Sequence, residues 1–192
     1  MSSPLLWYLN RATGAVLLVA FSLTVVLGIL ATGRRFSPLW PRFVTQGLHR
    51  ALAGVTLALL AAHVASAVID EYVDIRWWQA VVPFGATYRP LFLGLGAVAL
   101  DLLVVVGVTS LLRRHIPHRV WRAVHLSSYL AWAVSVVHGL GIGTDSAKLW
   151  SLALTAVCVG AVIASAAARL VVVARRLRTA PAGLPAASKA VA

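Results

Sequence analysis

Acidic residues are scarce in this sequence, and charge of either sign is uncommon. Five of the 192 residues are Asp or Glu, and only 11% of the chain is charged. A soluble domain of this size normally covers its outside with charged residues, so the composition excludes one. Five apolar runs of membrane-spanning length account for most of the sequence. We therefore predict a single integral membrane domain, with no room for a nucleotide-binding domain.

The sequence also lacks a second cysteine and a basic N-terminal segment, and each absence excludes a kind of structure. Cys158 is the only cysteine, so the chain has no internal disulfide and no cysteine-rich metal cluster. Residues 1–10 contain no basic residue, so the positive region that begins a signal peptide is missing. Arg34 and Arg35 follow the first apolar run instead, which is the wrong polarity for a cleaved signal. We expect this run to remain as a permanent helix.

The basic residues give the chain a formal net charge of +12. Because the arginines gather between the apolar runs, we expect membrane lipid headgroups rather than nucleic acid as their partner. The loops at 33–45 and 113–122 and the segment after 173 are basic, whereas the opposite side holds four of the five acids. By the positive-inside rule, the N-terminus lies outside and the C-terminus lies in the cytoplasm of a multi-pass membrane protein.

The apolar runs predict an all-α bundle of five transmembrane helices. Their expected limits are 12–32, 46–68, 90–112, 121–142 and 149–173. Between the second and third runs, residues 75–84 are too few to cross a bilayer and include Trp77 and Trp78, so we expect a short interfacial helix there. The chain then divides into an extracytoplasmic N-terminus at 1–11, the membrane domain at 12–173, and a cytoplasmic tail at 174–192. This tail is basic, then Ala/Pro-rich, which is typical of disorder.

Four histidines lie within the apolar runs. His49 and His63 in the second run are 14 residues apart, and His125 and His138 in the fourth run are 13 residues apart. In helices these spacings correspond to about 21 Å and 20 Å, and both helices run outward in the predicted topology. His49 therefore shares a depth near the cytoplasmic face with His125, and His63 shares a depth near the outer face with His138.

This arrangement of histidines predicts two haems b. Imidazole is a good iron ligand, and it is costly to leave in hydrocarbon without a partner. Two histidines at each of two depths are what two stacked bis-histidine haems need; hydrogen-bonded packing histidines are the alternative. At 100° per residue, 14 residues return to within about 40° of the same face, but 13 leave about 140° between His125 and His138. Either the fourth helix is overwound locally, or the haems approach it from different sides.

Several other residues are candidates for roles beside the haems. Trp132 follows His125 by seven residues, about 20° from its face of the helix. We expect Trp132 between the haems as a spacer or relay, or else as an ordinary packed tryptophan; Thr56 holds the equivalent place in the second run. Anionic haem propionates favour arginine. The candidates are Arg50 and Arg122 near the inner pair and Arg89 near the outer level.

Asp101 is the one acid within an apolar run. An ionised carboxylate at mid-span costs about 2.5–3.5 kcal/mol on insertion scales, so we expect Asp101 to be protonated, hydrogen-bonded to a buried donor, or facing a polar cavity. It has either a structural hydrogen bond or a role in handling protons or supporting a haem ligand. His115 and His118 lie in the basic loop, where we expect them to be solvated.

The spacing of the four histidines resembles that of the ferric reductase-like transmembrane domain superfamily. That superfamily includes ferric reductases, NADPH oxidases and the haem membrane subunit of bacterial methionine sulfoxide reductase systems. The resemblance covers residues 6–173 and is carried by the phrases WYLNRATG, RFVTQGLHR, VVPF, YRPLFLGLGAVALDLL and WRAVHLSSYL. It implies a compact bacterial member in the plasma membrane, with the inner haem iron bound by His49 and His125 and the outer one by His63 and His138.

The chain departs from the larger members of that superfamily, which have six spans and a cytoplasmic flavin and nicotinamide domain. The electron donor must then be a cytoplasmic flavoprotein or a membrane quinol, and the acceptor an extracytoplasmic protein or small molecule. A haem with both axial positions filled passes single electrons and has no open site for substrate. We therefore expect a transmembrane di-haem electron carrier, the membrane subunit of a reductase. The alternatives are a quinol-oxidising cytochrome b subunit of a larger complex, and a small transporter or scaffold without haem.

Overall fold

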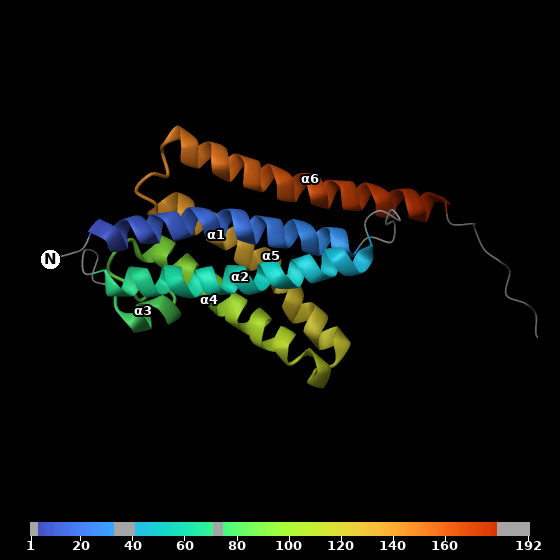
Figure 1. Ribbon diagram of the computed structural model, residues 1–192, viewed down its shortest axis with the longest axis horizontal. Helices are drawn as coiled ribbons and strands as arrows, with labels where there is room; N and C mark the ends of the chain where they lie inside the picture. Colours follow the sequence, from blue (N-terminus) through green and yellow to red (C-terminus); the bar gives the residue numbers. More distant parts are fainter. Residues whose placement is uncertain (1–3, 33–40, 71–74, 180–192) are drawn as a thin grey trace, which may run out of the picture.

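The computed structural model describes residues 4–32, 41–70 and 75–179, and these ranges fold into helices and turns without a strand (Figure 1). The elements are α1 (Pro4–Ala31), α2 (Arg42–Ile69), α3 (Trp77–Val81), α4 (Pro90–Leu111), the 3-10 turn η1 (Arg113–His115), α5 (His118–Ile142) and α6 (Leu149–Thr179). The predicted all-α fold is confirmed for these residues. Five of the helices, α1, α2, α4, α5 and α6, are long and apolar enough to cross a membrane by length and composition.

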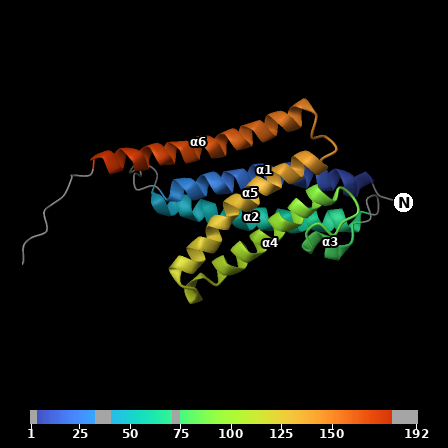
Figure 2. The same cartoon turned by 180° about the vertical axis from the view of Figure 1, so that it is seen from behind.

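Two antiparallel helix pairs and one further helix make up the bundle (Figures 1 and 2). α1 packs along α2, α4 packs along α5, and α6 packs chiefly on α1. Because α1 also contacts α5, it is the central helix that joins the two pairs. The buried core lies where these helices meet, and it consists of Phe21, Val25, Ile29, Leu103, Ala131 and Val162.

Two of the spanning helices are longer than their apolar runs. α1 begins at Pro4 rather than at residue 12, so most of the segment that was expected to precede the first span is part of its helix. Proline is tolerated in the first turn of a helix, where its missing N–H has no partner to lose. α6 continues to Thr179 rather than ending at residue 173, because arginine is a good helix former. Hydropathy marks the apolar part of a helix and not its ends. The predicted disordered tail from residue 180 lies outside the described residues.

The boundaries of α3 and α5 also differ from those predicted, and both follow from prolines. α3 has five residues and ends before Val82, which has an extended backbone (φ −101°, ψ 106°). A residue that precedes a proline, here Pro83, is disfavoured in the helical region. α5 begins at His118 instead of residue 121, directly after Pro117. His118 therefore belongs to the first turn of α5 rather than to a loop, although its side chain is exposed as expected.

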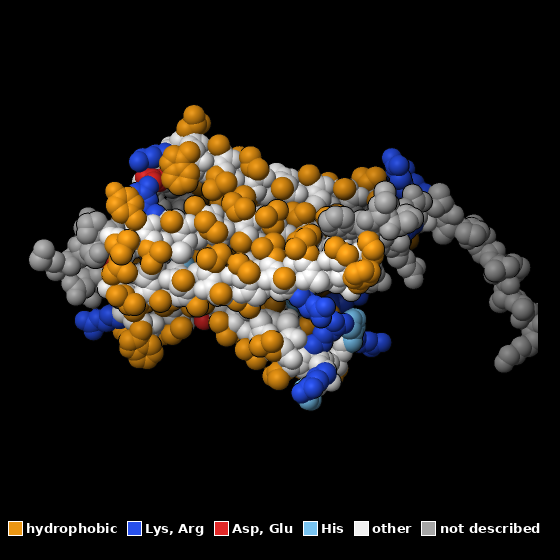
Figure 3. Space-filling view, viewed as in Figure 1, with side chains coloured by type: hydrophobic (Ala, Val, Ile, Leu, Met, Phe, Trp, Pro, Cys, Tyr) orange, Lys and Arg blue, Asp and Glu red, His pale blue; other side chains and the backbone are white. Residues whose placement is uncertain are grey.

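The surface is apolar along the bundle and basic at its ends. Figure 3 shows hydrophobic side chains over the length of α1, α2 and α6, with Lys and Arg gathered at the α4–α5 turn, at the end of α6 and near the start of α1. A bundle whose sides face hydrocarbon needs this distribution, since charged groups are costly there.

Candidate functional site

The four histidines within the spanning helices come together as two pairs. The ring centres of His49 on α2 and His125 on α5 are 6.1 Å apart, and the ring planes meet at 70°. His63 on α2 and His138 on α5 line one common cavity near the opposite end of the bundle. The structure therefore brings together the pairs that matching depth predicted.

His49 is held against α1 by a hydrogen bond and a close approach. Its Nδ1 lies 3.0 Å from the carbonyl oxygen of Thr24. Four residues later on α1, Gly28 leaves room for the ring, because a Cβ there would lie 3.3 Å from Cε1 of His49. We call this arrangement a carbonyl–glycine pocket: a helix carbonyl that faces Nδ1, with glycine four residues further along the same helix.

His63 has the same kind of pocket at the other end of α1. Its Nδ1 lies 3.1 Å from the carbonyl oxygen of Asn10, and a Cβ on Gly14 would lie 3.3 Å from its Cε1. The Asn10 side chain donates in turn to the His63 carbonyl at 3.0 Å. The two pockets are 14 residues apart on α1, and the two histidines are 14 residues apart on α2. The antiparallel helices therefore make the same contact twice, at the same spacing.

His138 has a third carbonyl–glycine pocket, formed by α4. Its Nδ1 lies 2.7 Å from the carbonyl oxygen of Phe92. Gly96 follows four residues later, and a Cβ there would lie 2.6 Å from both Cε1 and Nδ1 of His138. This approach is closer than those at the two α1 pockets, so only glycine fits at this position without movement of the ring or the helix.

The pockets fix the chemical state of three histidine rings. In an α-helix the carbonyl of residue i accepts the N–H of residue i+4, which here is the glycine; the carbonyl has a second lone pair for the imidazole. Facing a carbonyl, Nδ1 carries the proton and donates it. Nε2 is then the ring nitrogen with a free lone pair, the state of a metal-binding imidazole.

His125 has no carbonyl–glycine pocket. Its Nδ1 is buried and has no hydrogen-bond partner among the described residues. Its ring stacks instead on Trp121, one turn earlier on α5, with ring centres 4.9 Å apart and planes at 24°. The Arg113 guanidinium lies 4.2 Å from the centre of the Trp121 ring.

A cavity of about 360 Å³ lies beside His63 and His138. Its volume is within the range of about 300–1,000 Å³ that is typical of cofactor and ligand sites. All five spanning helices contribute to its walls, which are largely apolar near the histidines. The walls there include Gly14, Leu18, Phe21, Thr56, Leu60, Gly96 and Leu100.

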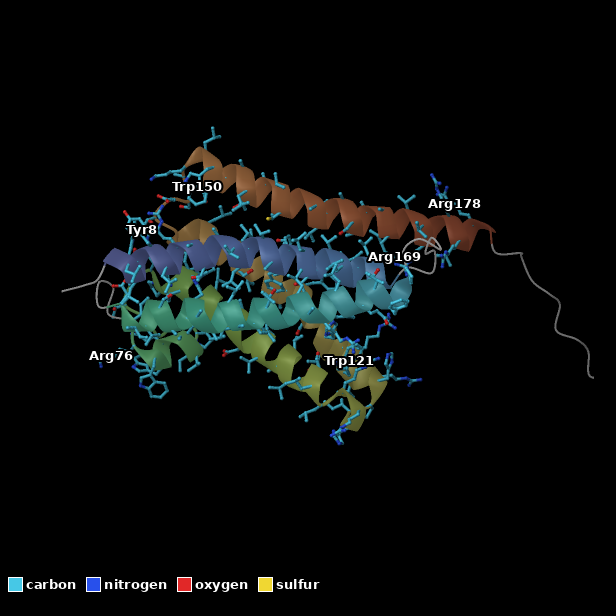
Figure 4. All side chains as sticks on the ribbon, in the orientation of Figure 1. Tyr8, Arg76, Trp121, Trp150, Arg169 and Arg178 are labelled. Carbon is cyan, nitrogen blue, oxygen red and sulfur yellow. The ribbon has the colours of Figure 1, made fainter. Side chains whose placement is uncertain are left out.

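The end of this cavity at Arg11 and Asp145 is polar, which the sequence analysis did not predict. Asp145 is buried there and pairs with Arg11 of α1, and Lys148 lies 2.9 Å from its other oxygen. The Arg11 guanidinium also lies 4.2 Å from the centre of the Trp7 ring. Figure 4 shows Tyr8 of α1 and Trp150 of α6 at this end of the bundle. The predicted topology placed Arg11 and Asp145 on the same side of the membrane. Their opposite charges were therefore the signal from which this ion pair could have been predicted.

Trp132 and Thr56 lie between the histidine levels but have different surroundings. The Trp132 indole N–H donates to the Ser22 hydroxyl on α1 at 3.0 Å, and its ring packs against the core. Thr56 is buried, lies 3.3 Å from the Thr24 hydroxyl and lines the cavity. Trp132 does not line the cavity, so its relay role stays a prediction.

The arginines proposed for propionate binding are all exposed. Arg50 and Arg122 do not line the cavity, and Arg89 donates to the Gly141 carbonyl, which ties the start of α4 to the end of α5. The sequence analysis missed Arg169, within the apolar run of α6 (Figure 4), whose Nη1 is buried without a hydrogen bond to any part of the described chain. A basic residue inside an apolar run was the signal that could have found it.

Asp101 is half-buried on α4 and does not line the cavity. Within residues 4–32, 41–70 and 75–179 its side chain has no hydrogen bond and no ion pair. The donor that the sequence analysis expected for a structural hydrogen bond is therefore not among these residues, and the proton-handling role stays a prediction.

The fold and the site together define a class of protein: helical bundles with five potential membrane spans and two histidine pairs. The profile of one family matches residues 5–145, and the chain belongs to that family, which is described as a domain of unknown function (DUF8596). The match includes all four paired histidines and the three carbonyl–glycine pockets. No curated protein and no solved structure matches the chain.

Proposed function

We propose that this protein is a transmembrane electron carrier that binds two haems b. His49 and His125 would hold the inner haem, and His63 and His138 the outer one. The observation that carries the proposal is the set of three carbonyl–glycine pockets, because each leaves Nε2 of a histidine free to bind iron. A helical glycine destabilises a helix by about 1 kcal/mol relative to alanine, and Gly14, Gly28 and Gly96 are explained by the room that they leave for the histidine rings beside the helix carbonyls.

The spacing of the inner pair supports the same function. Bonds between a metal and an imidazole nitrogen are about 2 Å long, so two imidazoles on one metal have ring centres roughly 6 Å apart. The separation of His49 and His125 is 6.1 Å. Within the described ranges no group of three or more His, Cys, Asp or Glu side chains could hold a metal ion. A porphyrin would supply the remaining nitrogen ligands, so two histidines would be enough to hold haem iron.

When bound, bis-histidine haem exchanges single electrons, and the chain's residues provide the setting for that exchange. The carbonyls of Asn10, Thr24 and Phe92 hold three ligand rings in one tautomer and orientation. The largely apolar walls of the cavity beside His63 and His138 would keep water away from a bound haem. Our proposal of a membrane subunit of a reductase, related to the ferric reductase-like superfamily, rests on these features and on the sequence resemblance.

The distribution of charge supports an orientation in the plasma membrane. The end of the bundle near His49 and His125 carries the basic residues Arg113, Arg114, Arg119, Arg122, Arg175, Arg176 and Arg178. The other end combines basic residues with Asp70 and Asp145. Positive charge favours the cytoplasmic side, so the N-terminus would lie outside and electrons would pass from the inner pair to the outer pair, toward an extracytoplasmic acceptor. A cytoplasmic flavoprotein is the donor that this direction favours, and a basic surface attracts an acidic protein.

A quinol-oxidising cytochrome b subunit is a second candidate, and one feature of the cavity favours it. The walls beside His63 and His138 extend to Ser151, Leu154 and Thr155 of α6, and α6 packs chiefly on α1. The cavity therefore extends to α6, a helix that is packed mainly on one neighbour. We propose that a lipid-soluble quinol could enter the cavity from the bilayer beside α6.

A visible spectrum of the purified protein tests the proposed function. We expect a sharp absorption band on reduction with dithionite and a haem content of two per chain, because each pair supplies two axial ligands. A transporter or scaffold without haem gives no such band. Absence of haem from protein made with an adequate haem supply would contradict the proposal.

Oriented membrane vesicles test the direction of electron transfer. With the haems reduced, a membrane-impermeant oxidant on the outer side is expected to reoxidise them quickly, because the outer pair faces it. Reoxidation only from the cytoplasmic side would show that the proposed direction of electron transfer is wrong. If a quinol analogue reduces the haems without any added protein, the quinol-oxidising function gains and a flavoprotein donor is unnecessary.

A further inference from the structure

His125 differs from the other three paired histidines in what holds its ring. Their Nδ1 atoms face helix carbonyls, whereas Nδ1 of His125 is buried without a partner among the described residues. The 13-residue spacing gives a reason. It turns His125 by about 140° from His138 on α5, so His125 cannot face α4 in the way that His138 does.

Trp121 lies against the ring of His125, which has no carbonyl–glycine pocket among the described residues. The two rings are nearly parallel, with planes at 24° and centres 4.9 Å apart, and residues four apart on a helix lie on the same face. Nε1 of Trp121 is also buried without a partner in the described chain, so the contact between the two residues is ring against ring and involves no hydrogen bond.

Arg113 in turn holds Trp121. Its guanidinium lies 4.2 Å from the centre of the indole ring, a distance at which a cation is attracted to the face of tryptophan. His118 also contacts this ring, with centres 5.7 Å apart. Figure 4 places Trp121 at the end of the bundle where α4 meets α5. Arg113, in the turn between these helices, thus contacts the ring that stacks against His125.

We infer that Trp121, held by Arg113, is a positioning residue for His125 and sets how firmly this histidine binds the inner haem iron. The inference rests on the proposed function. A ligand histidine that donates to a carbonyl is oriented and made more basic by that bond. His125 has ring contacts in place of such a bond within the described residues, so it would be the weakest of the four ligands. The inner and outer haem sites are therefore unequal.

Substitution of Trp121 tests this inference in the full-length, haem-loaded protein. Trp121→Leu removes the flat ring, so His125 is expected to leave the iron in part of the population. Carbon monoxide, which cannot bind reduced haem with both axial positions filled, should then bind to up to about one haem in two. The midpoint potential and low-spin electron paramagnetic resonance signal of one haem should change with it. Trp121→Phe keeps a flat ring and should restore all three properties toward those of the wild type.

Two matched controls separate positioning from general damage. Trp77→Leu removes an exposed tryptophan on α3 and should leave carbon monoxide binding at background. Arg113→Gln should raise carbon monoxide binding less than Trp121→Leu does, whereas Arg114→Gln, which removes a neighbouring charge without a ring contact, should not raise it. This arginine pair decides the question if Trp121→Leu fails to accumulate.

The possible failures are distinguishable. If Trp121→Leu carries two haems with unchanged potentials and binds no carbon monoxide, Trp121 does not position His125, and the proposed function stands. Equal behaviour of Arg113→Gln and Arg114→Gln contradicts the role of Arg113 and, where Trp121→Leu is not obtained, the inference itself. If the wild-type protein binds no haem, that result contradicts both the proposed function and the inference.

Discussion

His63→Ala is expected to reduce the haem content from two per chain to one. His63 would provide one of the two axial ligands of the outer haem, and alanine offers no atom that can bind iron. The inner pair is about 21 Å away along α2 and keeps its own contacts, so the inner haem should be retained. Haem per chain, measured as the pyridine haemochrome against protein concentration, gives the result directly.

His138→Ala should give the same loss, because it removes the other ligand of the same iron. His115→Ala is the matched control: His115 is exposed in the turn between α4 and α5, and its removal should leave two haems. Full haem content in both His63→Ala and His138→Ala would show that these residues are not the outer ligands.

Gly96→Ala is expected to impair the outer site while both of its histidines remain. The new Cβ would lie 2.6 Å from Cε1 and Nδ1 of His138, which is well inside contact distance. Either the ring swings away and loses its bond to the Phe92 carbonyl, or α4 and α5 move apart. We expect loss of most of the outer haem, measured by haem content and by the spectrum of the reduced protein.

The chain provides a graded set of controls for this substitution. Gly14→Ala and Gly28→Ala would each place a Cβ 3.3 Å from a histidine ring, so they should weaken their sites less than Gly96→Ala. Gly54 lies on α2 between His49 and His63, and a Cβ there would have no neighbour from another described part of the chain within 4 Å. Gly54→Ala should leave the haems intact and stabilise the helix by about 1 kcal/mol. Equal haem content in Gly96→Ala and Gly54→Ala would refute the role of the carbonyl–glycine pockets.

The number and order of the spanning helices could be predicted because hydropathy is a local property. Each apolar run reports its own preference for hydrocarbon, whatever it packs against. The histidine pairs could be predicted for a similar reason, since the spacing along a helix fixes relative depth. The ends of α1 and α6 could not, because both helices continue past their apolar runs, through Trp7 and Arg175, and hydropathy does not register hydrogen bonding.

The carbonyl–glycine pockets required knowledge of how two helices are aligned. The 14-residue separation of Gly14 and Gly28 matches that of His49 and His63, so the signal was present in the sequence. It acquires a meaning only when α1 and α2 are placed antiparallel in one register. The contact of Trp132 with Ser22 depends on packing between residues 110 positions apart, and no local pattern indicates it. The 13-residue spacing did indicate a difference at His125, but not the stack on Trp121.

The position of α1 in the chain has a consequence for the order of synthesis. The pockets of His49 and His63 are built from α1 and α2 alone, which are synthesised before α4, α5 and α6. Both rings can therefore be fixed in their tautomer once the first pair of helices has formed. The other member of each pair, His125 or His138, arrives only with α5. Since chains assemble from the N-terminus during synthesis, one half of each histidine pair is finished before the other half has been made.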